Sequence, residues 1–166
     1  MACMTFADDC VGHVMEALEN SQYADNTIVI FWTDHGWQLG HKDRWEKFTL
    51  WHQSTNSPLV IRYPGMRTAG KVCSEPVSFL DLYPTVLDLA KLPQRAILQG
   101  RTLMPWLENP SLEKETPAII TNSRDNHSVV WKNWNYIHYR DGSEELYDHD
   151  TDPREYHNLA DMPEHW

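Results

Sequence analysis

The first apolar pattern along the chain has the spacing of a helix. Phe6, Cys10, Val14 and Leu18 recur at every fourth position and would line one face of an α-helix. The polar residues that follow lead into Asp25-Asn26, a dipeptide typical of turns. We therefore expect an amphipathic helix followed by a short connection.

A continuous apolar run comes directly after this connection. Residues 27–33 are aromatic or β-branched and show no alternation with polar residues. Such a run predicts a strand that is covered on both faces, as in a parallel sheet flanked by helices. A helix, a short turn and a buried strand make up half of a βαβ unit, so the pattern favours the α/β class.

The next two elements are a strand and a helix. The run Pro-Leu-Val-Ile-Arg-Tyr predicts a strand over residues 58–63, which Pro64-Gly65 would end. A helix is expected over residues 79–91, with Ser78 or Asp81 as its cap. Pro84 would then fall in or near the first turn, where its missing N–H costs little.

The pattern changes after about residue 105. Short β-like stretches separated by polar residues occupy residues 117–121, 128–131, 134–139 and 145–147. Asp141-Gly142, between the last two stretches, is a strong hairpin signal. We expect residues 1–105 to form part of an α/β domain and residues 106–166 to form a small α+β subdomain with an antiparallel sheet.

Composition narrows the function classes. The 166 residues include 41% hydrophobic and 23% charged residues, as in ordinary globular proteins. No apolar run approaches the roughly 20 residues that cross a bilayer, so no membrane span is expected. The net charge of −10 argues against nucleic acid as the main partner, because phosphate binding requires excess cations. It leaves room for an anionic substrate held by a bound metal ion.

Candidate chemistry follows the strand predicted at residues 27–33. Asp34, His35 and Gly36 stand at its carboxyl end, where α/β sheets bind ligands. A carboxylate and an imidazole are able to share a divalent cation, and Gly36 would allow close backbone approach or positive φ. The alternative is that Asp34 caps a turn and His35 packs.

Three ordered stretches share the pattern of one family. They contain Asp34-His35-Gly36, Leu39-Gly40, Lys47 and Pro58-Leu59; Leu82-Tyr83-Pro84-Thr85; and Glu145-Leu146-Tyr147-Asp148, Asp152-Pro153 and Asn158-Leu159. Together they resemble the sulfatases of the alkaline-phosphatase superfamily, especially the branch of iduronate-2-sulfatase and choline-sulfatase. The resemblance implies an α/β fold, the alkaline-phosphatase-like three-layer sandwich, represented here by its C-terminal portion.

The resemblance also implies roles for matching positions. Asp34 and His35 would be Ca²⁺ ligands, Lys47 would be catalytic and contact the sulfate, and Trp37 would line the mouth of the substrate pocket. The substrate would be a sulfated small molecule or glycan. Location outside the cytoplasm (periplasmic, secreted or lysosomal) follows from the resemblance alone, since no signal peptide is recognisable in the sequence.

One motif of this family is missing from the chain. The family's nucleophile is a formylglycine made from cysteine in Cys-x-Pro-x-Arg, and none of Cys3, Cys10 and Cys73 stands in that pattern. The N-terminal part of the same domain, with this nucleophile and further carboxylate ligands, would therefore lie upstream. We expect the 166-residue chain to be inactive alone.

Two other interpretations remain open. A phosphodiesterase or phosphonate hydrolase of the same superfamily would share the Asp34-His35 metal ligands and differ in its nucleophile. A non-catalytic protein, either a glycan-binding module or a pseudoenzyme fragment, would share only the fold. His127 and His138 are further candidates for contact with an acidic sugar, although histidines in small sheets more often pack or face solvent.

Overall fold

The structure is a computed structural model and describes residues 2–162. Its helices are α1 (Ala2–Glu19), α2 (His52–Thr55), α3 (Leu82–Leu89) and α4 (Met104–Glu108). Its strands are β1 (Val29–Trp32), β2 (Leu59–Arg62), β3 (Ala118–Thr121), β4 (His127–Trp131), β5 (Trp134–His138) and β6 (Glu144–Asp148). Short 3-10 turns lie at Ala24–Asn26, His41–Asp43 and Phe79–Asp81. Each predicted helix and strand is therefore present, with ends shifted by a few residues.

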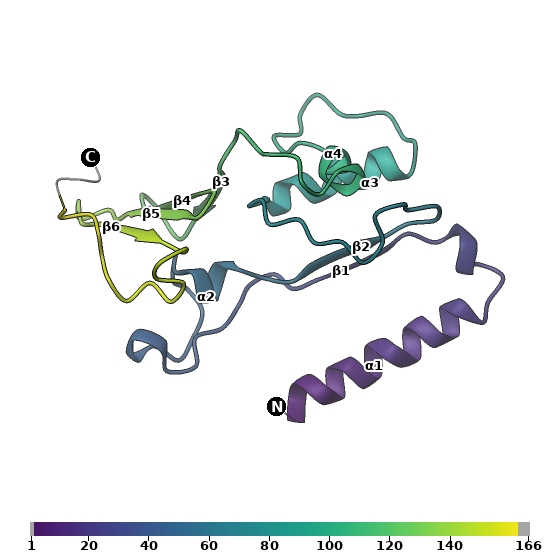
Figure 1. The fold of residues 1–166 in the computed structure, drawn as a ribbon, viewed down its shortest axis with the longest axis horizontal. Coiled ribbons are helices and arrows are strands. Elements are labelled where there is room, and N and C mark those ends of the chain that lie inside the picture. The colour runs from purple at the N-terminus through teal and green to yellow at the C-terminus, as the bar shows by residue number, and fades with distance from the viewer. Residues whose placement is uncertain (1, 163–166) are drawn as a thin grey trace.

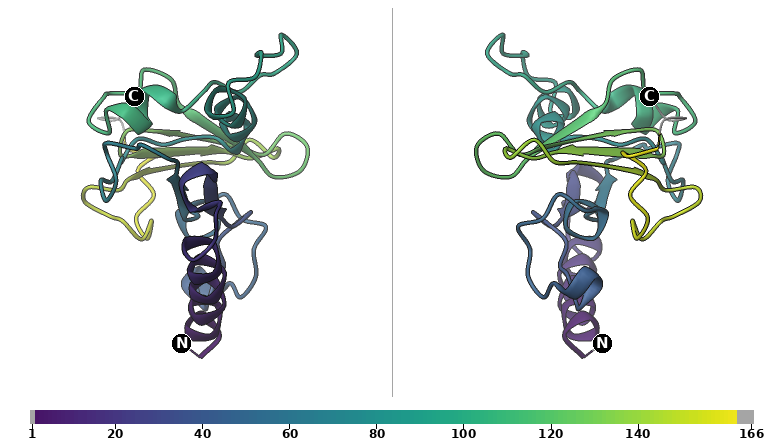
Figure 2. Two further views of the ribbon diagram at one scale, coloured as in Figure 1. Left: turned by 90° about the vertical axis from the view of Figure 1, so that its right-hand side faces the viewer. Right: turned by 90° about the vertical axis from the view of Figure 1, so that its left-hand side faces the viewer.

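Helix α1 stands apart from the other elements (Figures 1 and 2). None of its side chains is buried, and Phe6 and Val14 of the predicted apolar face are 71% and 68% exposed. The amphipathic pattern thus forms the expected helix without being covered within this chain. Among the described residues, no helix combines the length and apolar character needed to span a bilayer.

Strands β1 and β2 pair with each other in an antiparallel ladder that joins Val29 to Arg62 and Trp32 to Leu59. The predicted parallel sheet is therefore wrong for the described residues. Phe31 and Trp32 are about half exposed, so β1 is not covered on both faces in this chain either. An uninterrupted apolar run indicates a strand, but it does not specify the direction of the neighbouring strand.

The predicted cap residues Ser78 and Asp81 act together. The Ser78 hydroxyl accepts from the Leu80 N–H, and the Asp81 carboxylate accepts from the Ser78 N–H, which forms a capping box. This box begins the 3-10 turn that leads directly into α3, and Pro84 lies in the first turn of α3 as expected. Asp81 also accepts from the Arg101 N–H and so joins α3 to the chain before α4.

The C-terminal strands form an antiparallel sheet in the order β3-β4-β5-β6. Asp141-Gly142 makes the turn between β5 and β6, where Gly142 has a φ of 86° and its N–H donates to the Tyr139 carbonyl. The predicted antiparallel subdomain is confirmed as a sheet. The division at residue 105 stays a prediction, and that residue lies inside α4.

The largest buried apolar cluster joins this sheet to the segment before α2. Leu50, Ile137 and Tyr147 are each at most 2% exposed, and Trp51, Ile120 and Tyr139 pack against them. The segment that contains Lys47 is therefore held against the C-terminal sheet by apolar contact.

Candidate active site

Two of the three polar residues predicted to act together, Asp34 and Lys47, lie close to the third, His35. The Lys47 Nζ atom lies 2.7 Å from the His35 Nε2 atom, and the Asp34 Oδ2 atom lies 3.4 Å from the same nitrogen. Asp34 and His35 directly follow β1, and Lys47 comes from the loop between β1 and α2. The carboxylate, imidazole and ammonium groups thus share one region.

The hydrogen bonds of His35 define its tautomer. Its Nδ1 lies 2.7 Å from the Gly36 carbonyl oxygen, which only accepts, so Nδ1 carries the proton. Nε2 then has the lone pair that accepts from the Lys47 ammonium. This arrangement leaves Nε2 suited to ligate a cation, because a second hydrogen bond at Nδ1 orients the ring.

Asp34 is the solvent-exposed residue of the three. Its side chain is 79% exposed, whereas that of His35 is 29% exposed. Apart from His35, its carboxylate meets the Thr33 hydroxyl, 3.5 Å from Oδ1. The Thr33 hydroxyl also donates to the His35 carbonyl at 3.2 Å, which ties the end of β1 to the site. The carboxylate therefore has room for a further ligand.

Gly36 has a role in packing against α2. Its N–H donates to the Ser54 carbonyl at 2.8 Å, and a Cβ atom at this position would lie 1.9 Å from the Gln53 carbonyl oxygen. The expected close backbone approach is present, but the partner is the backbone of α2. Only glycine allows His35 to lie this close to α2.

A buried glutamine supports the loop behind the site. Gln38 is fully buried, and its Nε2 donates to the Thr49 and Ser54 hydroxyls at 3.2 Å each. Its own N–H donates to the Glu46 carbonyl, next to Lys47 in the sequence. Sequence patterns did not predict this role, because a glutamine between Trp37 and Leu39 has no local signal for burial.

Trp37 lies beside His35, with 6.1 Å between the ring centroids, and is 49% exposed. It does not line the cleft of about 1010 Å³ that opens next to Lys47. His127 and His138 face each other across the β4–β5 pair, away from the lining of this cleft, and His127 bonds to the Thr121 hydroxyl. Of the four predicted site residues, Lys47 lines this cleft, and its ammonium group also contacts His35.

The residue after Lys47 has a strained backbone. Phe48 has a φ of 64°, a rare conformation for a bulky residue, and is 72% exposed. The Asn122 Nδ2 atom donates to the Phe48 carbonyl at 2.6 Å from the loop between β3 and β4. The C-terminal sheet therefore helps to hold the conformation of the chain at Lys47, a contact that the sequence did not reveal.

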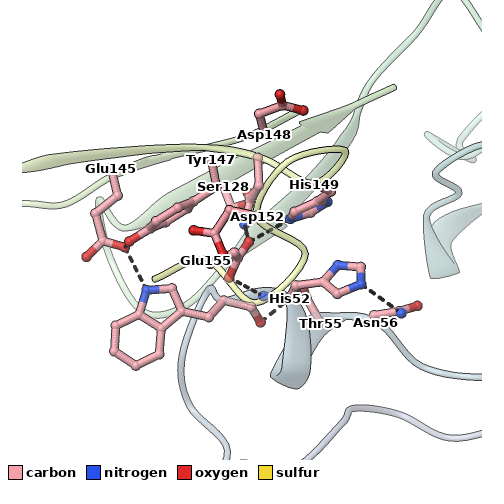
Figure 3. Close-up of polar contacts among 12 residues, drawn as sticks. His52, Thr55, Asn56, Ser128, Glu145, Tyr147, Asp148, His149, Asp152 and Glu155 are labelled. Atoms are coloured by element: carbon pink, nitrogen blue, oxygen red, sulfur yellow. Dashed lines mark hydrogen bonds and ion pairs between the residues drawn. The ribbon is translucent and has the colours of Figure 1, made fainter. Parts of the chain in front are cut away.

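A buried polar network fixes the C-terminal segment to α2 (Figure 3). Glu155 is 1% exposed and accepts from Asn135 Nδ2 at 2.7 Å, His149 Nε2 at 2.8 Å and the His52 N–H at 2.8 Å. Burial raises the pKa of Glu155, but these hydrogen bonds outweigh it and hold that pKa below its ordinary value. Burial and the neighbouring His149 lower the pKa of His52.

A second contact uses Lys42. Its Nζ donates to the Tyr147 hydroxyl at 2.8 Å and lies 4.3 Å and 4.2 Å from the centres of the Trp51 and Tyr147 rings. Burial lowers the pKa of Lys42, and the carboxylate of Glu145 acts in the opposite direction. The Lys42 side chain therefore joins β6 to the segment between β1 and α2, residues 33–51, which we call the site loop.

The described residues contain no complete metal site made from side chains of this chain. Within residues 2–162, no group of three or more His, Cys, Asp or Glu side chains is arranged to hold a metal ion. The acidic turn at residues 148–152 instead satisfies its own backbone, since Asp148 accepts from the Asp150 N–H. Asp34 and His35 provide a carboxylate and an imidazole nitrogen, two groups that are chemically able to ligate a cation.

Comparison with known proteins shows the family to which the sequence is similar. Residues 1–92 match the model of a protein family described as "Sulfatase". Over 160 residues the chain is 40% identical to a protein named "Sulfatase" from Formosa agariphila, covering 96% of this chain and 31% of that protein. It is 32% identical over 165 residues to "Arylsulfatase K" from Danio rerio, covering 92% of this chain and 31% of that protein. The chain thus spans about a third of the length of these relatives.

Solved structures show the same likeness. The structure of a protein in complex with its substrate D-glucosamine-2-N,6-O-disulfate superposes with a TM-score of 0.84 at 27% identity, covering 95% of this chain and 35% of that one. Phosphonate monoester hydrolase of Agrobacterium radiobacter superposes with a TM-score of 0.79 at 27% identity, covering 95% of this chain and 36% of that one. Both covered shares again correspond to about a third of a longer protein.

Proposed function

The chain belongs to the sulfatase family and has its alkaline-phosphatase-like α/β fold, and from this premise we propose that it supplies one part of the active site of a sulfate ester hydrolase. One observation carries the proposal: Lys47 Nζ and Asp34 Oδ2 both lie within 3.4 Å of His35 Nε2. A carboxylate, an imidazole and an ammonium group at one point are what a cation and a sulfate group require.

Asp34 and His35 would hold the cation. The exposed Asp34 carboxylate and the Nε2 lone pair of His35 fit two ligand positions. We propose Ca²⁺, which favours carboxylate oxygens; an imidazole nitrogen also suits transition metals, so the identity of the ion requires a test. When bound, the cation would stabilise negative charge on the sulfate oxygens.

Lys47 would contact the sulfate. Cleavage of the ester builds charge on the leaving oxygen and on the non-bridging oxygens, and an ammonium group held in a fixed place stabilises that charge. The hydrogen bond from Asn122 to the Phe48 carbonyl holds the backbone beside Lys47 in place for this contact. Trp37, beside His35, would line the entrance for the substrate.

The nucleophile would come from outside these 166 residues. The sequence has no Cys-x-Pro-x-Arg motif, so we propose that a formylglycine and further metal ligands belong to an N-terminal part of the same domain. The 166-residue chain alone would then be inactive. The substrate would be a sulfated sugar or a similar small molecule, because the structural relative with a TM-score of 0.84 holds a sulfated glucosamine. We further propose a location outside the cytoplasm, on the family resemblance alone.

Hydrolysis of 4-nitrophenyl sulfate tests this function. The assay uses the intact protein, which includes the proposed N-terminal part. We expect turnover that EGTA abolishes and that Ca²⁺ restores better than Mn²⁺ or Zn²⁺. Lys47→Met and Asp34→Asn should each lower kcat/KM at least about 100-fold, as expected for loss of a charged group that acts in the transition state. Arg101→Gln changes an exposed arginine in the segment before α4 and should match the wild type. Turnover that survives Asp34→Asn would contradict the proposal.

A second candidate is hydrolysis of phosphonate monoesters. It is favoured by the similarity to phosphonate monoester hydrolase, with a TM-score of 0.79. Both reactions would use the same cation ligands and the same lysine. Turnover of 4-nitrophenyl phenylphosphonate with a higher kcat/KM than 4-nitrophenyl sulfate would favour this alternative.

A further inference from the structure

A cleft of about 1010 Å³ opens between the site loop and the C-terminal sheet. Its walls come from residues 43–51 on one side and from the loops around Asn122, Asn126 and residues 139–145 on the other. Lys47 lines this cleft and also bonds to His35. A substrate that reaches Lys47 with its sulfate group would therefore place the rest of its structure in this cleft.

The lining of the cleft carries no excess of positive charge. Its cationic side chains are Arg44, Lys47 and Arg140. Its carboxylates are Asp43, Glu46, Asp141 and Glu145. A chain with many sulfate groups requires an excess of cations on the protein, as all polyanions do, and this lining has none.

Two of the four carboxylates in the cleft already accept hydrogen bonds from the protein. Glu145 accepts from the Trp51 indole N–H at 2.6 Å and from the Tyr147 hydroxyl at 2.8 Å. Asp141 accepts from the backbone and the hydroxyl of Ser143. In the described part of the chain, Glu46 has no ion pair. Its carboxylate is therefore available to accept hydrogen bonds from a ligand.

The arginines of the cleft are available in the same way. Within residues 2–162, neither the Arg44 nor the Arg140 guanidinium pairs with a carboxylate. Arg140 is placed by its backbone, because its N–H donates to Asn126 Oδ1 at 2.9 Å. Arginine donors beside carboxylate acceptors match neighbouring hydroxyl groups, which both donate and accept.

Aromatic side chains complete the lining. Trp45 and Phe48 are 68% and 72% exposed, an unusual exposure for side chains of this size. The Trp45 ring lies against Gly40. A Cβ atom added to Gly40 would lie 3.3 Å from this ring, so the lack of a side chain leaves room for the indole. Flat apolar faces next to polar groups suit the C–H face and the hydroxyls of a sugar ring.

We propose that this cleft holds the sugar ring that carries the sulfate ester, with Trp45 against the ring face and Arg140 and Glu46 at its hydroxyls, and that its lack of excess positive charge selects against densely sulfated chains. The inference rests on the proposed function, because it assigns the sulfate group to Lys47. It defines the substrate class as a glycan with few sulfate groups.

Binding of a sugar that resists hydrolysis tests the ring contact. The probe is the 6-sulfonate analogue of N-acetylglucosamine, whose carbon–sulfur bond is not an ester, titrated calorimetrically into the intact protein. Trp45→Ala should weaken binding about fivefold, while Trp45→Phe retains most of the affinity. Trp131→Ala is the matched control, because Trp131 is another exposed tryptophan, 45% exposed, that lies on β4 outside the cleft. Equal losses for both alanine variants would overturn the ring contact.

Charge selection is tested with a heparin-derived tetrasaccharide. The wild type should bind this polysulfated probe more weakly than the sulfonate sugar. The double variant Asp43→Asn with Glu46→Gln should bind it about fivefold more tightly, because two repelling charges are removed from the cleft. The control pair, Glu113→Gln with Glu115→Gln, changes the net charge equally at exposed positions elsewhere and should alter binding less than about twofold, because distant charges are screened.

These outcomes separate the two proposals. Tighter binding of the tetrasaccharide than of the sulfonate sugar by the wild type, or an equal gain in both double variants, would overturn charge selection. Lack of binding of the sulfonate sugar by the wild type would overturn the sugar cleft. Failure of the proposed function appears separately, as absence of 4-nitrophenyl sulfate turnover while the cleft still binds the sulfonate sugar.

Discussion

His35 is the residue on which the other site groups converge. Its ring is held by the Gly36 carbonyl at Nδ1, and its Nε2 accepts from Lys47 while Asp34 approaches the same atom. A cation and Lys47 would compete for the lone pair of Nε2, because a nitrogen lone pair serves one strong partner at a time. Binding of the cation would therefore release the Lys47 ammonium towards a bound sulfate.

The close packing of Gly36 against α2 predicts a loss of stability when a side chain is added at this residue. Gly36→Ala would place a Cβ atom 1.9 Å from the Gln53 carbonyl oxygen, so α2 or the site loop must move. We expect a loss of about 3 kcal/mol in the free energy of unfolding, measured by urea denaturation. Gly12→Ala is the matched control: no atom lies within 4 Å of its added Cβ, and alanine favours the helix, so stability should rise by up to about 1 kcal/mol. Equal stability of Gly36→Ala and the wild type would contradict this view of the packing.

At the scale of elements, Glu155 is the cap of a helix far away in the sequence. It accepts the N–H of His52 at the first turn of α2, while its other oxygen accepts from Asn135 and His149. All its described partners are donors. In Glu155→Gln, the new amide N–H groups would face at least one of these donors, and a buried polar group would lose its partner.

Glu155→Gln should therefore lower the free energy of unfolding by about 2 kcal/mol. Glu113→Gln, at an exposed position between α4 and β3, should leave the free energy of unfolding unchanged within about 0.5 kcal/mol. Both values are measured by urea denaturation at neutral pH. A loss for Glu155→Gln no larger than that of the control would mean that the network contributes nothing to stability.

The His52–His149 contact predicts a dependence of stability on pH. The rings lie 4.4 Å apart, and burial, followed by repulsion from His149, lowers the pKa of His52 in the folded state. Between this lowered pKa and the unfolded value of about 6.5, the unfolded chain binds more protons at this position. The contribution is thus complete above about pH 6.5 and is lost as the pH falls towards the folded pKa.

We expect His52→Gln to flatten the decrease in stability below about pH 6.5, measured as the urea midpoint at several pH values. The comparison concerns the slope with pH, so a uniform loss of stability in the variant does not affect it. His13→Gln, at an exposed position on α1, should keep the wild-type slope. An identical slope for His52→Gln and the wild type would contradict the assignment.

The elements differ in how far the sequence alone predicts their arrangement. Asp141-Gly142 and the alternating residues around it predict the β5–β6 hairpin, because register in a hairpin is set locally. The direction of β1 relative to β2 is set by a partner about thirty residues away, and an apolar run carries no information on it. Asp34, His35 and Lys47 share one loop and one motif and were predictable, whereas the Asn122–Phe48 and Glu155–His52 contacts join distant segments without a local signal.

At the scale of the whole molecule, the site loop and the C-terminal sheet form one folded unit, while α1 stands outside it. Lys42, Asn122 and Glu155 each join the two segments, and Leu50 packs with Ile137 between them. Helix α1 buries none of its side chains, and most of the stability of helices in proteins comes from packing of an amphipathic face. Stability should therefore differ sharply between these two parts.

Hydrogen exchange of the chain measures this difference. Amides of β4, β5 and α2 should exchange with a common slow rate, and those of α1 at least about 100-fold faster, because opening α1 exposes no core. Glu155→Gln should then accelerate β5 and α2 together by about 30-fold, the factor that corresponds to about 2 kcal/mol, and leave α1 unchanged. If only α2 became faster, the loop that carries Lys47 would open independently of the sheet. The C-terminal residues would then act as a local cap, and the cleft between the two segments would not be a fixed binding surface.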